Sequence, residues 1–227
     1  MRYRDIVAYT SFDLDAMPRR EGYPLFLTAV VPRPIGWIST ISPSGVRNAA
    51  PFSWFNAVCA KPYLLVVAVA RQRDGSPKDT SRNARDTGEF VVNIVGEGSA
   101  PVMVQSSAEY PPDVDEFSEL GLTAVESESV KPPRIGESPI HLECELERTI
   151  DLGEGAVDLL FGRVRRMHAA PGVLAEDGRV DAERLRPVAR LGRDEYAVID
   201  RVVRHARPAV PSSSPAPKTP PPEPPTP

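Results

Sequence analysis

Apolar runs of strand length dominate the chain. Residues 24–31 and 34–41 are rich in β-branched and aromatic side chains, which favour strands. The sequence Ser-Pro-Ser-Gly at 42–45 then predicts a hairpin turn. Residues 63–70 form a continuous apolar run that predicts a fully buried strand, and residues 89–95 form another.

Residues 140–150 alternate apolar and acidic positions. The apolar positions are Leu142, Cys144 and Leu146, and the acidic ones are Glu143, Glu145 and Glu147. This period of two predicts a strand with one face in the core and the other in water. Residues 157–167 and 196–203 predict two more strands.

Helix signals are fewer. Asp79 and Thr80 precede a polar run that ends at Gly88, which predicts a helix with an N-cap and a glycine stop. Residues 101–108 and 181–185 predict short helices. Many strands with few helices, at this length, predict a mainly β fold with flanking helices, built as a closed or split antiparallel barrel.

Composition and charge narrow the class of protein. The chain has 227 residues and a net charge of −4, which argues against a nucleic-acid partner because such a partner needs a basic surface. The first twenty residues contain no apolar signal core, and the apolar run at 62–70 is too short to cross a bilayer. We therefore expect a cytoplasmic protein in which Cys59 and Cys144 are unpaired thiols, with a single disulfide as the alternative.

Proline marks the end of the folded domain. Ten of the 26 prolines lie within residues 208–227, a stretch that cannot bury apolar area. We expect an N-terminal extension over 1–22, one domain over 23–206, and a disordered Pro-rich tail over 207–227. The tail is interpreted as solvated, and a docking peptide for a proline-reading module is the alternative.

Several common site motifs are missing from the sequence. It contains no glycine-rich dinucleotide or P-loop motif and no Gly-x-Ser-x-Gly nucleophile turn. His141, His168 and His205 are isolated, so no metal site is expected. The acidic group Asp113, Asp115 and Glu116 has no calcium-loop spacing and is interpreted as a solvated loop.

Two segments carry residues that suit a flat ligand with a phosphate. The first, at 32–56, brings hydroxyls, amides and aromatics close together, and the second, at 76–83, places Lys78 just before a helix start. A phosphate favours a helix N-terminus, hydroxyls and a lysine, whereas a flat ring favours an apolar slot with a few polar contacts. Ordinary turn and cap residues would explain the same pattern without a ligand.

An ordered set of motifs resembles the flavin reductase-like family, the FMN-binding split barrels. The matching stretches are PRPIGWIST, NAAPFSWFN, DGSPKDTSRN, TGEFVVNI, DEFSELGLT, KPPRIGESPIHLEC, GRV at 162–164 and RLGRDEY at 190–196. The resemblance as a whole covers roughly residues 23–198. The resemblance implies a six-stranded antiparallel split barrel that forms a homodimer, with FMN, or FAD as an alternative, near the subunit interface.

The resemblance also implies roles for particular residues. The residues expected to contact the flavin are Ser39, Thr40, Asn48, Ala50, Pro51, Phe52, Ser53, Phe55, Asn56, Lys78, Asp79 and Thr80. Lys78 would be the charge partner of the phosphate, and Asp79 is expected to cap its helix because two anions repel. Arg193 departs from the family, which often has a second glycine at this place. Arg193 would narrow the substrate side of the flavin or pair with a nicotinamide phosphate.

The implied activity is NAD(P)H:flavin oxidoreduction. Hydride would pass from nicotinamide C4 to flavin N5, and the reduced flavin would serve a partner monooxygenase or another electron acceptor. Hydride transfer needs no side chain as acid or base, and His168 and Tyr196 are the only catalytic candidates. Two alternatives stay open, an FMN-bound electron carrier reduced by a partner protein and a non-catalytic protein that binds flavin or haem.

Overall fold

A computed structural model describes residues 9–153, 156–206 and 208 as a mainly β fold with flanking helices, which confirms the predicted class. The helices are α1 (Arg19–Ala29), α2 (Asp79–Thr87), α3 (Ala100–Gln105), α4 (Glu116–Leu120) and α5 (Ala182–Leu185), with 3-10 turns at Glu97–Ser99 and Pro171–Val173. The strands are β1 (Arg33–Pro34), β2 (Gly36–Ile41), β3 (Arg47–Phe52), β4 (Phe55–Ala60), β5 (Tyr63–Ala70), β6 (Glu89–Ile94), β7 (Ala124–Val125), β8 (Arg134–Ile135), β9 (Ile140–Leu152), β10 (Val157–Ala169), β11 (Val188–Gly192) and β12 (Glu195–Val198).

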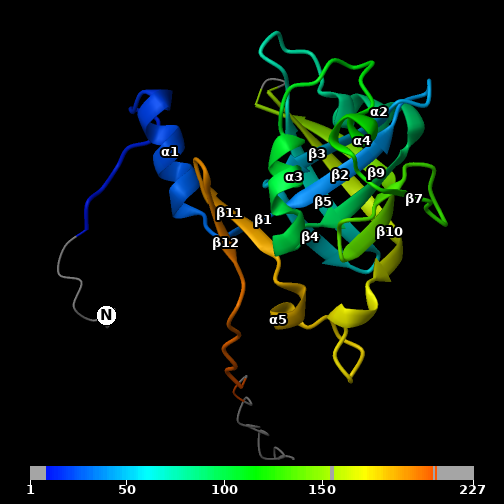
Figure 1. The fold of residues 1–227 in the computed structure, drawn as a ribbon. Coiled ribbons are helices and arrows are strands. Elements are labelled where there is room, and N and C mark those ends of the chain that lie inside the picture. Colours follow the sequence, from blue (N-terminus) through cyan, green and yellow to red (C-terminus); the bar gives the residue numbers. More distant parts are fainter. Residues whose placement is uncertain (1–8, 154–155, 207, 209–227) are drawn as a thin grey trace, which may run out of the picture.

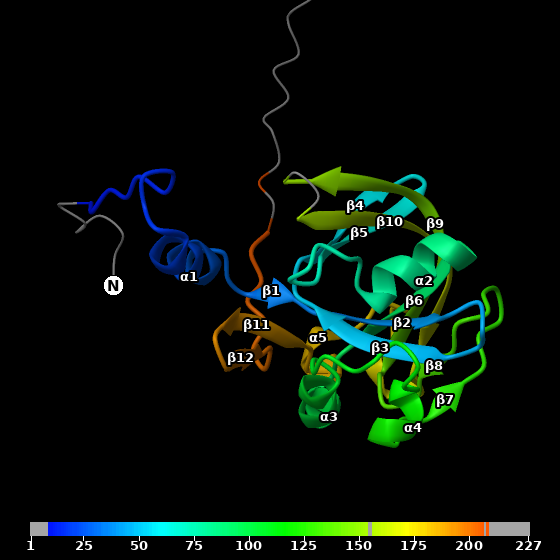
Figure 2. The same ribbon diagram turned by 90° about the horizontal axis from the view of Figure 1, so that it is seen from above.

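The main sheet curls into an open barrel (Figures 1 and 2). Its seven strands, counted over the described residues, run antiparallel in the order β3-β2-β6-β9-β10-β5-β4. The edge strands β3 and β4 are joined by Ser53 and Trp54 alone. The two edges of the sheet are therefore connected directly by this short link. Ala68 N–H donates to the Trp54 carbonyl at 2.8 Å and fixes this crossing. This break between β3 and β4 gives seven strands where the resemblance implies six.

An arm projects from the barrel (Figure 1). It consists of α1 and a second sheet, in which β11 lies between β1 and β12. The helix α1 packs against β11, and only Gly22 of α1 is buried. The arm therefore leaves much of its apolar surface exposed in a single chain.

Two apolar clusters fill the barrel and its α3–α4 side. Inside the barrel, Phe90, Leu160 and Ile38 are fully buried with their neighbours. Gly162 makes room for this core, because a Cβ there would lie 2.4 Å from the Phe90 ring. On the other side, Trp37 is fully buried with Met103, Phe117 and others. Because Trp37 belongs to this cluster and the neighbouring Ile38 to the other, β2 lies between the two clusters.

The first predicted strand is wrong, because residues 24–31 lie mostly in α1. Their β-branched and aromatic side chains resemble a strand, but tertiary contacts favour the helix. The Arg33 guanidinium donates to the carbonyls of Leu27 and Val30, two of the groups that the end of a helix leaves without partners. The long-range role of Arg33 is invisible to local propensity.

Two burial predictions also need correction. Residues 63–70 form β5 as predicted, but only alternate residues such as Leu65, Val67 and Val69 are buried. In β9 the predicted wet face holds at Glu145 and Glu147, whereas Glu143 is fully buried. Glu143 accepts hydrogen bonds from the backbone N–H groups of residues 128 and 129, because a loop folds over that end of the strand.

Other local predictions are confirmed. The turn at 42–45 closes through Gly45 N–H to the Ser42 carbonyl, and α2 ends at Gly88 with φ 74°. Asp181 caps α5, and the last predicted strand is shorter, ending at Val198. Both cysteines are unpaired, with Cys59 exposed and Cys144 buried. None of the described helices is long and apolar enough to span a bilayer. The predicted tail, apart from residue 208, lies outside the described residues.

Candidate functional site

A cavity of about 100 Å³ lies at the start of α2, and we call it the α2 cavity. Strand β3, the loop before α2, the segment after α3 and the start of α4 form its walls. The lining residues are Asn48, Ala50, Pro51, Phe52, Gln72, Lys78, Asp79, Thr80, Ser106, Ser107, Ala108, Glu109, Tyr110 and Glu116. The two segments that the sequence singled out therefore meet at this cavity.

The N-terminus of α2 is open toward an acceptor. Its N-cap residue is Lys78, which offers no side-chain hydrogen bond to the first backbone N–H groups. Those groups have no acceptor within the helix and carry its positive dipole end. Among the described residues, Lys78 makes no ion pair. An uncapped helix start beside an unpaired ammonium is suited to bind an anion.

The capping role predicted for Asp79 is wrong. Asp79 is the first helical residue of α2 and not its N-cap, and its carboxylate is paired with Arg82 three residues along. The neighbouring Thr80 is buried and accepts a hydrogen bond from the Asn48 amide at 3.0 Å. This bond ties β3 to the start of α2, so both sides of the cavity are held in one geometry.

A buried carboxylate anchors α2 to the barrel from the other side. Asp158 of β10 has a side chain that is 1% exposed, and it accepts a hydrogen bond from Ser81 at 2.6 Å. Arg71 donates to it at 2.9 Å, and Arg85 lies 3.1 Å away. Although desolvation opposes the shift, these hydrogen bonds and charges keep the pKa of Asp158 below its usual range.

Glu116 is a site residue that sequence reasoning missed. It lies at the start of α4, is 5% exposed, accepts the Ala49 N–H and lines the α2 cavity. Burial raises the pKa of Glu116 to about 7, the nearby carboxylates of Asp79 and Asp115 act in the same direction, and the Ala49 bond opposes them. The acidic segment was interpreted as a solvated loop, and the apolar Phe117 and Leu120 that follow were the available signal for a packed helix.

A second cavity, of about 280 Å³, adjoins the first and shares Pro51 and Ser107 with it. We call it the arginine cavity, since three arginines lie in its wall between the barrel and the arm. The lining residues are Tyr23, Leu27, Arg33, Ile35, Pro51, Ser53, Trp54, Met103, Ser107, Arg190, Gly192, Arg193 and Tyr196. The two cavities together form one continuous candidate site along the β3 edge.

The structure brings together most, but not all, of the predicted flavin contacts. Those lining one or both cavities are Asn48, Ala50, Pro51, Phe52, Ser53, Lys78, Asp79 and Thr80. Ser39 and Thr40 are fully buried behind the site, where Ser39 donates to the Pro133 carbonyl and Thr40 accepts from Asn83. Phe55 packs against the barrel core and Asn56 is exposed, and neither lines a cavity.

The two catalytic candidates lie apart. Tyr196 lines the arginine cavity, whereas His168 lines neither cavity and bonds to the buried Glu143 at 2.7 Å. Burial and nearby cations lower the pKa of His141, beside His168, to about 4, and its ring bonds to Asn93. The same Glu143 carboxylate accepts the backbone N–H groups of residues 128 and 129, so His168 is connected to the loop over β9. The described residues hold no group suited to bind a metal ion.

Comparison with known proteins identifies the family. Residues 28–184, more than half of the chain, match the model of the flavin reductase like domain. The chain belongs to the flavin reductase-like family. A protein of Halalkalibacterium halodurans is 44% identical over 200 residues, which cover 86% of this chain and 95% of that protein.

Solved structures of this family share the fold over nearly their whole length. Nitrilotriacetate monooxygenase component B from Bacillus cereus is 38% identical with a TM-score of 0.83, covering 87% of this chain and 99% of that one. The 2-nitrobenzoate 2-nitroreductase NbaA from Pseudomonas fluorescens is 30% identical with a TM-score of 0.80, covering 90% and 100%. The split-barrel fold implied by the resemblance is therefore confirmed, and a flavin is the cofactor that this family membership supports.

Proposed function

We propose that this flavin reductase-like protein is an NAD(P)H-dependent reductase that binds FMN. The choice of FMN rests on one observation. Lys78, at the uncapped N-terminus of α2, makes no ion pair within the part of the chain that the structure describes. A phosphate needs cationic and N–H donors, and both converge on the α2 cavity. At about 100 Å³, this cavity has room for the phosphate end of the cofactor and not for a whole nucleotide.

The donors of the cavity fit a phosphate, and its three carboxylates are compatible with one. Glu109 is exposed, so water screens its charge. Asp79 is neutralised by Arg82, so its charge is compensated within α2. Glu116 has a pKa raised to about 7, so a large part of it is protonated near neutral pH. Lys78, Thr80 and the first N–H groups of α2 would therefore hold the phosphate.

The end of β3 and the β3–β4 link shape the rest of the site. Pro51, Phe52 and Ser53 supply an apolar wall with a few polar atoms at the junction of the two cavities. A bound flavin would supply the chemistry of accepting a hydride from a reduced nicotinamide and passing the electrons onward. The protein's part is to hold the cofactor, keep one side accessible and orient the second substrate.

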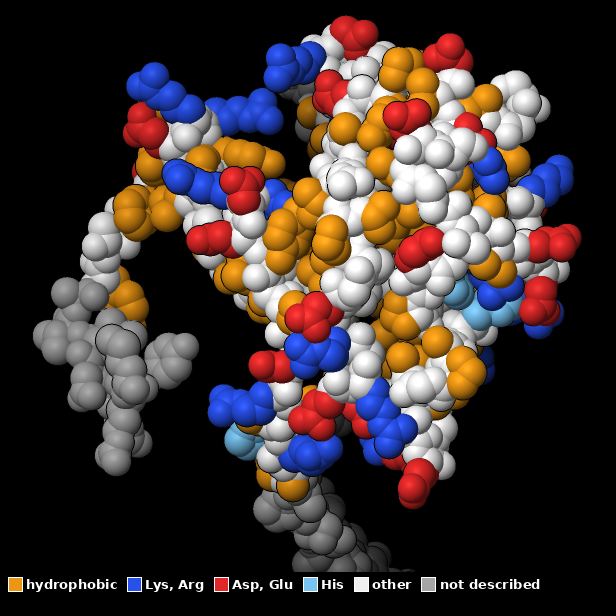
Figure 3. All heavy atoms as spheres, in the orientation of Figure 1, with side chains coloured by type: hydrophobic (Ala, Val, Ile, Leu, Met, Phe, Trp, Pro, Cys, Tyr) orange, Lys and Arg blue, Asp and Glu red, His pale blue; other side chains and the backbone are white. Residues whose placement is uncertain are grey.

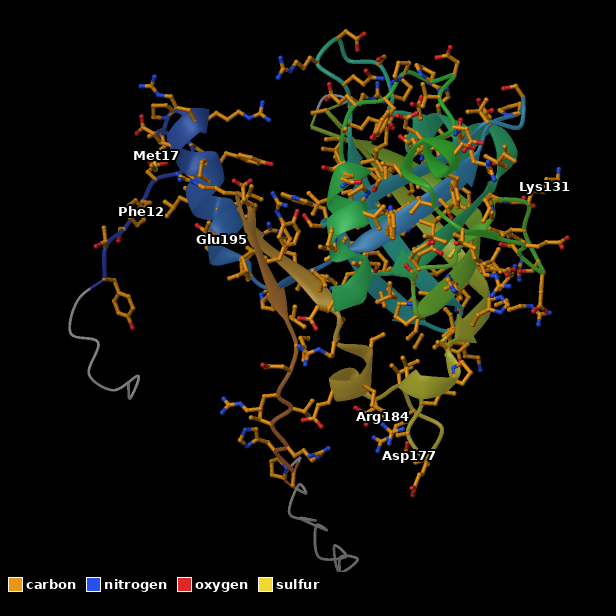
Figure 4. The ribbon with its side chains drawn as sticks, in the orientation of Figure 1. Phe12, Met17, Lys131, Asp177, Arg184 and Glu195 are labelled. Atoms are coloured by element: carbon orange, nitrogen blue, oxygen red, sulfur yellow. The ribbon has the colours of Figure 1, made fainter. Side chains whose placement is uncertain are left out.

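A homodimer and a partner oxygenase belong to the same proposal. Exposed apolar residues gather on the arm and the segment leading to it (Figure 3), where Phe12, labelled in Figure 4, is 54% exposed. The others are Tyr9, Leu14, Tyr23, Phe26, Val30 and Val31, with Trp54 beside Phe26. Such a patch favours association with a second copy.

The similar Bacillus cereus protein is a monooxygenase component, which supports a monooxygenase as the acceptor of reducing equivalents.

Sedimentation equilibrium tests the dimer. We expect two copies per particle at micromolar concentration. Replacing Phe26 with Glu should shift the equilibrium toward monomer, because a charge would enter an apolar contact. A wild-type monomer at that concentration would contradict this part of the proposal.

The proposal also places the protein in the cytoplasm. The exposed thiol of Cys59 fits such a reducing compartment.

The function is tested by comparing flavins with and without a phosphate. The protein should bind FMN at least about tenfold more tightly than riboflavin, which has the same ring and ribityl chain. It should also oxidise NADH or NADPH when FMN is added. Tight FMN binding without nicotinamide oxidation would favour the electron carrier, and binding of haem alone would favour the non-catalytic alternative. Equal affinity for both flavins would contradict the assignment of the phosphate site.

Glu116 gives the site a pH-dependent stability. Its folded pKa of about 7 lies above its usual value, so ionisation costs stability as pH rises through this range. Glu116→Gln keeps an acceptor for the Ala49 N–H and removes the charge. We compare the free energy of unfolding of the variant with that of wild type at two pH values. The difference between them should shift in favour of the variant by about 1–3 kcal/mol when the pH is raised from about 5 to about 8. Urea unfolding at both pH values measures this, and an equal difference at both would show that Glu116 does not titrate there.

A further inference from the structure

The arginine cavity concentrates positive charge without compensation. Arg33, Arg190 and Arg193 all contribute to its wall, and no aspartate or glutamate is among the described residues that line it. The next acidic residues along the chain, Asp194 and Glu195, are exposed, and neither makes an ion pair with these arginines in the described part of the chain. Glu195 lies on the β11–β12 hairpin, where Figure 4 labels it.

Arg33 is the most deeply buried of the three. It is 8% exposed, and two carbonyls at the end of α1 accept hydrogen bonds from its Nη1. Its Nε is buried and has no partner among the described residues. Burial and the neighbouring Arg190 guanidinium lower the pKa of Arg33. A buried cation with an unused donor is costly unless an anion completes its hydrogen bonds.

The other two arginines come from the β11–β12 hairpin. Arg190 lies over the Tyr196 ring, 4.6 Å from its centroid, and donates to the Tyr196 hydroxyl and the Arg193 carbonyl. These acceptors are neutral, so the charge of Arg190 stays uncompensated. Stacking on Tyr196 therefore holds the Arg190 guanidinium in the wall of the cavity.

Arg193 has an unfavourable backbone. Its φ is 44°, a left-handed conformation that is strained for a non-glycine residue and relaxed for glycine. Strained residues of this kind cluster at functional sites, and here the strain places a third guanidinium beside the cavity.

The remaining walls suit a ring. Tyr23, Trp54 and Tyr196 line the cavity together with Pro51 and Leu27, and its volume of about 280 Å³ is small for a whole dinucleotide. We propose that the arginine cavity binds the second substrate of the flavin site through an aromatic ring together with a carboxylate or phosphate attached to it, either directly or through a sugar. This inference rests on the proposed function, because the cavity adjoins the α2 cavity through Pro51 and Ser107. This ligand is either a small aromatic acid or the adenosine phosphate end of the reduced dinucleotide.

Arg193→Gly tests the proposal without disturbing the fold. Glycine adopts the observed φ freely, so the melting temperature should stay close to that of wild type. Arg186→Gly is a matched control, because Arg186 has φ 46° and lies outside the arginine cavity, paired with Glu97. Isothermal titration of the full chain, with and without FMN, would use benzoate and 2′,5′-ADP as probes.

The two probes distinguish the two ligands. We expect at least one probe to bind wild type and Arg186→Gly equally, and to bind Arg193→Gly at least about tenfold more weakly. Benzoate alone would assign a small aromatic acid, and 2′,5′-ADP alone the dinucleotide, with KM for NADPH raised in parallel. FMN affinity should be the same in all three proteins.

Three results would overturn the proposal. These are the binding of neither probe to wild type, equal probe affinity in Arg193→Gly, and a change in oligomeric state in Arg193→Gly without a change in probe binding. The last would assign the arginines to a subunit contact. Failure of FMN binding in wild type would instead overturn the proposed function. The titrations without FMN distinguish this failure from a failure of the arginine cavity to bind its ligand.

Discussion

Replacing Lys78 with alanine is expected to weaken FMN binding by about 1.5–3 kcal/mol, roughly 10- to 150-fold. The reason is the loss of a charge-assisted hydrogen bond at the N-terminus of α2, where Lys78 has no carboxylate partner among the described residues. Fluorescence quenching of FMN on titration with protein measures the change. Riboflavin binding should stay the same, because riboflavin lacks the phosphate.

Lys131→Ala is the matched control for this result. Lys131, labelled in Figure 4, is exposed, and its backbone N–H donates to Glu89, which follows the C-terminal end of α2 and lies away from the N-terminus that carries Lys78. Its side chain lines neither cavity, so its removal should leave FMN affinity unchanged. If Lys78→Ala binds FMN as tightly as wild type, the phosphate does not lie in the α2 cavity. If both variants lose affinity equally, the effect is one of overall charge and not of the site.

Asp158→Ala is expected to lower the free energy of unfolding by about 2–4 kcal/mol, which is roughly 5–15 °C in melting temperature. The variant leaves the Ser81 hydroxyl and two guanidinium groups without their shared acceptor beneath α2. The lower end of the range reflects partial exposure of Arg71 and Arg85. Because α2 carries Lys78, FMN affinity should fall as well. Thermal and urea unfolding measure the loss.

Asp177→Ala provides the contrast for Asp158. Asp177, labelled in Figure 4, is exposed and pairs with the exposed Arg179, so its removal should cost little. The pKa of Asp158 is held below its usual range, so its contribution is present above that range and is lost as pH falls through the folded pKa. A cost for Asp158→Ala no larger than that for Asp177→Ala would show that this ion cluster does not anchor α2.

Local sequence signals predicted most of the barrel. Strand patterns were sufficient for β2, β5, β6, β9 and β10, and Gly45 and Gly88 marked a turn and a helix end correctly. These features depend on near neighbours along the chain. The α1 helix was missed because its end is stabilised by Arg33, which lies beyond it in the sequence. Burial of Glu143 was missed because the covering loop comes from a distant segment.

The candidate site was predictable in part for the same reason. The β3 residues Ala50 to Phe52 and the residues Lys78 to Thr80 lie in contiguous motifs, and the fold brings the two motifs together at one cavity. Glu116 and Arg33 reach the site only through tertiary packing, and the apolar residues after Glu116 indicate a packed helix without indicating the site. Ser39 and Thr40 belong to the same motif as the site but point into the interior, where Asn93 and Asn83 bond to them.

Whether this protein is a flavin reductase is measured by its visible spectrum after purification, recorded before and after adding FMN and then NADH without oxygen. We expect protein-bound flavin bands near about 450 nm, a general property of flavins, that bleach rapidly with NADH or NADPH. Bands that appear but do not bleach would contradict the reductase and leave a flavin-bound electron carrier. A protein that retains no flavin would contradict the claim that the α2 cavity is a cofactor site.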